Sequence, residues 1–139
     1  MPNASQHENK AKHNRQFLET IDCGTTSDWA AVVAFYTAVH VIERLRALDG
    51  DHSKDHQDRL QYVATHHRTI HTEFHGLLNA SYLARYQANA TFFGQISNDD
   101  VKSNLIDRFL VAIEGYAENY VATKKLHKSN PSPKINDFC

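Results

Sequence analysis

The feature that most constrains this chain is the run from Trp29 to Ile42, which contains no Asp, Glu, Lys or Arg. A helix that is apolar on every side must be buried among other helices or inside a membrane. The run is shorter than the roughly 20 apolar residues that span a bilayer, and it includes Thr37 and His40. It therefore predicts a buried central helix, with Trp29 packed against the third and last helices of a bundle.

Composition limits the organisation and the location of the protein. A chain of 139 residues is long enough for one domain with its own core. The 15 basic and 16 acidic residues nearly cancel, so binding of nucleic acid must depend on a local site. The polar N-terminus lacks the apolar stretch of a signal peptide, which favours a cytoplasmic protein that does not contact a membrane. We expect a disordered N-terminus over 1–7, one helical domain over 8–128 and a flexible tail over 129–139.

The spacing of apolar residues indicates helices throughout this domain. Gly24 and Gly50 are placed where a helix C-terminus is expected. The expected position of a break in the third helix is the run His66-His67-Arg68. Aromatic residues in the loop 85–97 are expected to pack on the bundle and to border a site. The sequence thus predicts an all-α, four- to five-helix up-and-down bundle without strands. Its expected helices are 8–22, 29–48, 56–84 as one or two helices, and a last one capped by 97–100 and ending at 124–128.

Arg59 and His66 are the candidate catalytic residues. They are seven positions apart, which returns both to nearly the same side of a helix, two turns from each other. The fork of an arginine suits phosphate oxygens, and a histidine can move protons on and off a ribose hydroxyl or a leaving oxygen. The alternative is that both are polar residues flanking a buried stripe, with Arg59 paired to Asp55 or Asp58.

Three further features have a structural and a functional interpretation. His67, His71 and His75 follow one another at i,i+4 spacing, as in pairs of metal ligands, but no further ligand motif accompanies them and His67 is predicted to point into the core. We therefore expect no metal and no other cofactor. His40 is interpreted as a core histidine with a hydrogen-bond partner. Arg85 is either a clamp on carbonyl groups or a second phosphate contact.

A set of residues in this order and spacing resembles the HEPN superfamily of small prokaryotic helical domains. The resemblance covers about residues 10 to 122. The residues that carry it are Lys12-His13-Asn14 with Phe17, Asp28-Trp29-Ala30 leading into Phe35-Tyr36 and His40, His52-Ser53 with His56 and Arg59, and Leu77-Leu78 before Ala84-Arg85-Tyr86.

The resemblance implies a homodimer that engages RNA or a nucleotide. Many HEPN domains are metal-independent ribonucleases of toxin–antitoxin or defence systems, with an arginine and a histidine separated by four to six intervening residues in a cleft shared by both protomers. Arg59 and His66 fit this spacing, as do Arg68 and His75, and His56 and Arg85 are the expected substrate-binding residues. An antitoxin or another protein is an expected partner. Other HEPN-like proteins are catalytically silent interaction modules, and that alternative stays open.

Overall fold

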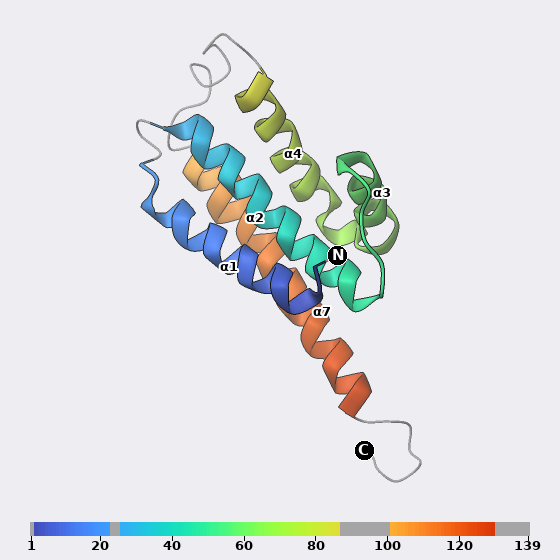
Figure 1. The fold of residues 1–139 in the computed structure, drawn as a ribbon. Coiled ribbons are helices and arrows are strands. Elements are labelled where there is room, and N and C mark those ends of the chain that lie inside the picture. The colour runs from blue at the N-terminus through green and yellow to red at the C-terminus, as the bar shows by residue number, and fades with distance from the viewer. Residues whose placement is uncertain (1, 23–25, 87–100, 130–139) are drawn as a thin grey trace.

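The computed structural model describes residues 2–22, 26–86 and 101–129, and these residues form helices and connecting turns without a β-strand. The all-α bundle predicted from the sequence is confirmed. Four long helical segments run alternately up and down, and a short helix packs beside one end (Figure 1). The elements are α1 (Ala4–Thr20), α2 (Ser27–Leu48), α3 (His56–His66), η1 (Arg68–Ile70), α4 (His71–Tyr86), η2 (Val101–Leu110) and α7 (Val111–Ser129).

Helix α2 is the centre of the bundle, as its uncharged run predicts. It packs against α1, α4, η2 and α7. Four alanines along it are buried, so neighbouring helices approach its backbone closely, and Phe35, Ile42 and Leu45 are completely buried between them. The helix ends at Leu48 with Asp49 as its C-cap, and Gly50 adopts a φ of 79° that favours glycine.

Trp29 is not part of this core, so its predicted burial against the third and last helices is wrong. Its side chain is 62% exposed on the first turn of α2. The core-facing positions of this turn are Ala30, Ala31 and Ala34. Trp29 shares the opposite stripe with the partly buried Val33 and Tyr36, which follow at four and seven residues. An uncharged run specifies that a helix is buried but does not specify which large residue faces the core.

Helix α1 begins within the segment expected to be disordered. Asn3 caps it: the Asn3 side chain accepts a hydrogen bond from the Gln6 backbone N–H, and Gln6 Oε1 accepts one from the Asn3 N–H, both at 2.8 Å. This reciprocal capping box satisfies two donors that would otherwise lack partners. Residues 4–7 are therefore helical, and His7 is buried.

The third predicted helix is divided where the sequence suggests. Helix α3 ends at His66, His67 leaves helical geometry with φ −137° and ψ 50°, and η1 connects to α4. His67 is only 1% exposed. A hydrogen bond joins its Nδ1 to the Tyr116 hydroxyl at 2.8 Å and another joins its Nε2 to the Tyr62 hydroxyl at 3.0 Å. The break therefore turns an imidazole into the bundle, where both its nitrogens are satisfied.

The segment η2 is a π-helix that leads directly into α7. Its hydrogen bonds run from i to i+5, and its buried residues are Val101, Leu105, Ile106 and Leu110, so that each outer residue is four and five positions from the adjacent pair in the middle. Opposite them, a Cβ on Gly76 of α4 would lie 2.7 Å from Phe109 Cε2, so any larger residue would require the Phe109 ring to shift. Phe109 itself is only partly buried.

Some predictions fall outside the described residues: the end of the first helix at 23–24, most of the aromatic loop 85–97, the cap 97–100 and the tail from 130 onward. Beyond the bundle, α7 projects toward the C-terminus (Figure 1). Within the described segments, none of the helices combines the length and apolar character needed to cross a bilayer.

Candidate functional site

Arg59 lies at the contact between α3 and α2, where Glu43 holds its guanidinium. Arg59 Nε donates to Glu43 Oε2 at 2.7 Å, and the two side chains are 11% and 7% exposed. The other carboxylate oxygen, Oε1, accepts a hydrogen bond from the Ser53 backbone N–H at 3.3 Å. The alternative partners considered from the sequence, Asp55 and Asp58, have other roles: Asp55 caps α3, and Asp58 pairs with Arg46.

His56 is the second partner of Arg59. Arg59 NH1 lies 2.7 Å from His56 Nδ1. Because a guanidinium only donates, Nδ1 must be the unprotonated nitrogen, and the neutral ring carries its proton on Nε2. Burial, together with the charges of Arg59 and Arg85, lowers the pKa of His56. His56 is therefore a neutral ring that helps to fix Arg59, and its edge packs on Phe35.

Arg85 reaches the same face from α4. Its Nε donates to the Ser81 carbonyl at 3.2 Å, which agrees with a clamp on a carbonyl group. NH1 donates to the Tyr36 hydroxyl at 3.2 Å, and the Tyr36 ring lies 6.0 Å from the His56 ring. Two hydrogen-bonded groups thus meet at the ring contact between Tyr36 and His56. We call them together the Arg59 network: Tyr36, Glu43, Ser53, His56, Arg59 and Arg85.

His66 occupies a different environment at the last turn of α3. Its ring stacks on Tyr62 with centroids 4.9 Å apart, and the residue is exposed. His66 Nδ1 lies 3.3 Å from the Tyr62 carbonyl oxygen. A carbonyl only accepts, so this contact favours the tautomer with the proton on Nδ1 and leaves the lone pair on Nε2. This is the tautomer that lets Nε2 act as a base.

Within one chain, Arg59 and His66 share a helix but do not converge. Seven residues correspond to roughly 10 Å along a helix axis, and Arg59 turns toward α2 while His66 faces solvent. The competing residues, Arg68 and His75, are both exposed, but the first lies in η1 and the second in α4. One continuous helix thus carries Arg59 and His66 but not the second pair, and even within that helix the two side chains face different surroundings.

The three histidines considered as metal ligands are separated by the break at His67. Both His67 nitrogens are engaged by tyrosine hydroxyls, whereas His71 and His75 stack on each other with centroids 5.8 Å apart. Among the residues that the structure describes, no group of three or more His, Cys, Asp or Glu side chains is arranged to hold a metal ion.

Sequence reasoning missed Glu43 and His7. Glu43 follows Phe35 and Val39 at helical spacing on a buried face, so a carboxylate there needs a cationic partner, and this signal was present in the sequence. His7 lies in the segment expected to be disordered. Its Nδ1 is 3.0 Å from Nδ1 of His40, so the predicted hydrogen-bond partner of His40 comes from α1.

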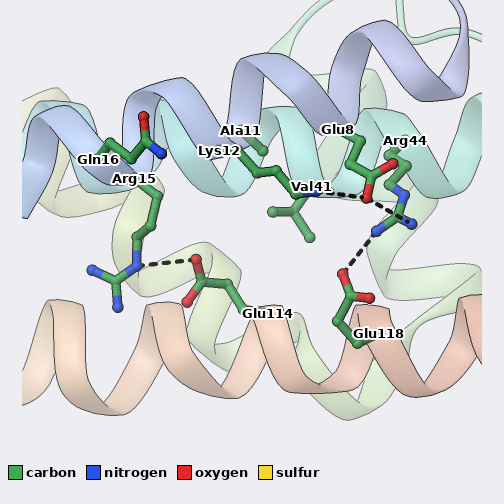
Figure 2. A pocket seen from close by; sticks show the side chains of 9 residues that line it. All are labelled: Glu8, Ala11, Lys12, Arg15, Gln16, Val41, Arg44, Glu114 and Glu118. Carbon is green, nitrogen blue, oxygen red and sulfur yellow. Dashed lines mark hydrogen bonds and ion pairs between the residues drawn. The ribbon is translucent and has the colours of Figure 1, made fainter.

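A cavity of about 250 Å³ lies between α1, α2 and α7, away from the Arg59 network. Figure 2 shows its charged side chains closing on one another in ion pairs: Glu8 and Glu118 with Arg44, and Glu114 with Arg15. Its three acids and three bases balance, so its charge favours neither an anion nor a cation.

Comparisons of the chain with protein-family models, with curated proteins and with solved structures return no match.

Proposed function

We propose that the protein is an HEPN-like homodimer that binds RNA and cleaves it without a metal. Arg59 holds a phosphate and His66 is the acid/base group, while His56 and Arg85 contact the substrate. In this proposal His66 Nε2 takes the proton of a ribose 2′-hydroxyl, whose oxygen attacks the adjacent phosphorus, and a protonated His66 returns a proton to the leaving oxygen.

The observation that carries this proposal is the state of His66. It is exposed, its ring is fixed by Tyr62, and its contact with a backbone carbonyl favours the tautomer with a lone pair on Nε2. Since Arg59 and His66 do not converge in one chain, the proposal requires a second protomer that brings its Arg59 near this His66. The protein is then a dimer in solution, with two equivalent sites.

A second candidate is a catalytically silent interaction module, which the Arg59 network favours. The Arg59 guanidinium already has a buried carboxylate and an imidazole as partners. A phosphate would compete with Glu43 for it. In this reading Arg59 fastens α3 to α2, and the protein acts through a protein partner such as an antitoxin.

The test is cleavage of single-stranded RNA by the full chain in the presence of a chelator. We expect RNA to be cut and DNA of the same sequence to be spared, because the reaction needs the 2′-hydroxyl. His66→Ala should abolish cleavage while RNA affinity stays within about twofold, since an acid/base group acts on the transition state. Light scattering should report a dimer.

His75→Ala is the matched control, because it removes an exposed histidine from the neighbouring helix. Cleavage that survives His66→Ala but is lost in His75→Ala would show that the wrong pair is assigned. Phosphate contacts are strongest at low salt. If the wild-type protein neither cleaves nor binds RNA under that condition, the catalytically silent interaction module becomes the better supported function.

A further inference from the structure

A second pocket, open to solvent, lies where the N-terminal turns of α1 meet His40 of α2. It has a volume of about 540 Å³ and is lined by Pro2, Gln6, His7, Lys10 and His40. None of these residues is acidic, in contrast to the cavity of Figure 2, where acids and bases alternate. Its volume lies in the range of small-molecule sites.

One hydrogen bond joins the two histidines of this cavity, and it runs between their Nδ1 atoms. His7 Nδ1 and His40 Nδ1 are 3.0 Å apart, and the rings are tilted by 32° with centroids 5.2 Å apart. A hydrogen bond between two imidazole nitrogens needs a proton on one and a lone pair on the other. In the neutral pair, therefore, one ring donates through Nδ1 and has a bare Nε2, and the other accepts through Nδ1 and carries Nε2–H.

A single added proton changes this pair in a defined way. It can enter at the bare Nε2 without breaking the contact between the two Nδ1 atoms. The singly protonated pair then has a charge of +1 and an N–H donor on Nε2 of each ring. A second proton would put hydrogens on both Nδ1 atoms and break the contact. The pair is thus built to hold one extra proton and to offer two donors with it.

Burial is the main cause that favours the neutral form of this pair. Burial lowers the pKa of His40 to about 4, and His7, Lys10 and Arg59 act in the same direction while Glu43 opposes them. Burial also lowers the pKa of His7; Glu43 opposes this, and His52 and Arg59 add to it. Lys10 therefore supplies the positive charge of the cavity at neutral pH, and an anion beside the pair would favour its protonation.

We propose that His7, Lys10 and His40 form a binding site for a phosphate ester dianion, and that binding is coupled to uptake of one proton by the histidine pair. The site contains neither Arg59 nor His66, although the charge of Arg59 acts on both histidines, and it does not depend on RNA cleavage. Its ligand is a phosphate group carried by a small molecule or by the end of an RNA strand.

Sulfate is the first probe, because it remains a dianion across the pH range in which histidine titrates. We expect saturable binding to the full chain by titration calorimetry, with an affinity that rises as the pH falls from 7.5 to 5.5. One coupled proton gives a rise of at most about tenfold per pH unit. Nitrogen NMR of the imidazoles should show both rings of the pair changing on sulfate addition.

Variants separate this site from general attraction of anions. Lys10→Ala should weaken sulfate binding about fivefold, the size of an exposed charge contact, and His40→Gln should remove the pH dependence. Lys12→Ala removes an exposed lysine two residues away that pairs with Glu8 outside the cavity, and should leave the affinity unchanged. His66→Ala should also leave it unchanged, so that this proposal and the proposed ribonuclease can fail independently.

Two ligand comparisons identify the source of the phosphate. A ribonucleoside 5′-monophosphate that competes with sulfate supports a small-molecule ligand. A short RNA with a 5′-phosphate that competes better than the same RNA with a 5′-hydroxyl supports a strand end. Sulfate affinity that is independent of pH, equal losses in Lys10→Ala and Lys12→Ala, or failure of both phosphate esters to compete would overturn the proposal.

Discussion

Glu43 shows how one residue fixes the candidate site. Burial alone would raise the pKa of its carboxyl group, but hydrogen bonds from Ser53 and Arg59 and the charge of Arg59 outweigh this, so the pKa of Glu43 is lowered. The carboxylate is therefore ionised at neutral pH and needs its partner. A buried ion pair adds little net stability, yet loss of one member leaves an uncompensated charge.

Arg59→Met should destabilise the protein by about 3–5 kcal/mol at pH 7, since it leaves Glu43 buried without a counter-ion. The lowered pKa means that the stabilisation from Glu43 is complete above the unfolded pKa of about 4.5 and is lost as the pH falls through the folded pKa. In the variant the unpaired Glu43 carboxyl protonates at higher pH, so the loss of stability relative to wild type should be smaller at pH 4.5 than at pH 7.

Urea unfolding of both proteins at pH 7 and at pH 4.5 measures this loss. An equal loss at the two pH values would contradict the prediction. Arg68→Met, at an exposed arginine, is the control.

Trp29 and Phe35 give a matched pair on one helix. Phe35→Ala removes a completely buried ring and should cost about 3–5 kcal/mol. Trp29→Ala removes a larger but exposed ring and should change the free energy of unfolding by no more than about 0.5 kcal/mol. Denaturant unfolding of both variants distinguishes them. A cost for Trp29 comparable to that of Phe35 would mean that Trp29 is covered in solution.

At the scale of elements, the break between α3 and α4 depends on a directional chain of hydrogen bonds. Tyr62 donates to Asp49 Oδ2 at 3.0 Å, so its oxygen accepts from His67 Nε2–H. His67 Nδ1 is then the acceptor for the Tyr116 hydroxyl. This chain joins the end of α2, the end of α3 and α7, and it requires a neutral His67.

His67→Phe keeps the ring but removes both hydrogen bonds, and should cost about 1–3 kcal/mol at pH 7. Burial lowers the pKa of His67, so its contribution is complete above the unfolded pKa of about 6.5 and declines as the pH falls toward the folded value. The difference between wild type and variant should therefore narrow from pH 7 to pH 5.5. Thermal unfolding across this range tests it, with His75→Phe as an exposed control. A constant or widening difference would refute the proposed chain.

The elements were more predictable than the contacts between them. Local signals located the end of α2 at Asp49-Gly50 and the break at His67, because glycine and a cluster of polar residues act within a few positions. The start of α1 required recognition of the reciprocal bonds between Asn3 and Gln6. The π-helical spacing of η2 could not be anticipated from an α-helical period. Arg59 contacts Glu43, and His7 contacts His40, across positions that are far apart in the sequence. Periodicity within one helix does not predict such contacts between helices.

For the whole molecule, a formal net charge of −1 means that long-range attraction does not bring RNA to the protein. Any affinity must come from the few cations at the candidate site. His56 is neutral at pH 7, since its Nδ1 accepts from Arg59 and its pKa is lowered by burial and by the two arginines. If the proposed RNA site exists, Arg59 and Arg85 are the groups expected to neutralise phosphates there.

Binding of single-stranded RNA should consequently depend weakly on salt. Each neutralised phosphate contributes about −0.7 to the slope of log affinity against log salt, so two arginines predict about −1.4 per site. Arg59→Ala and Arg85→Ala should each reduce that slope by about 0.7, because each removes one contact. Lys102→Ala, at an exposed lysine paired with Asp107 in η2, should leave it unchanged. Fluorescence anisotropy of labelled RNA at 50 to 200 mM salt gives these slopes. A steep slope that is the same in all three variants would indicate diffuse binding rather than a site at Arg59 and Arg85.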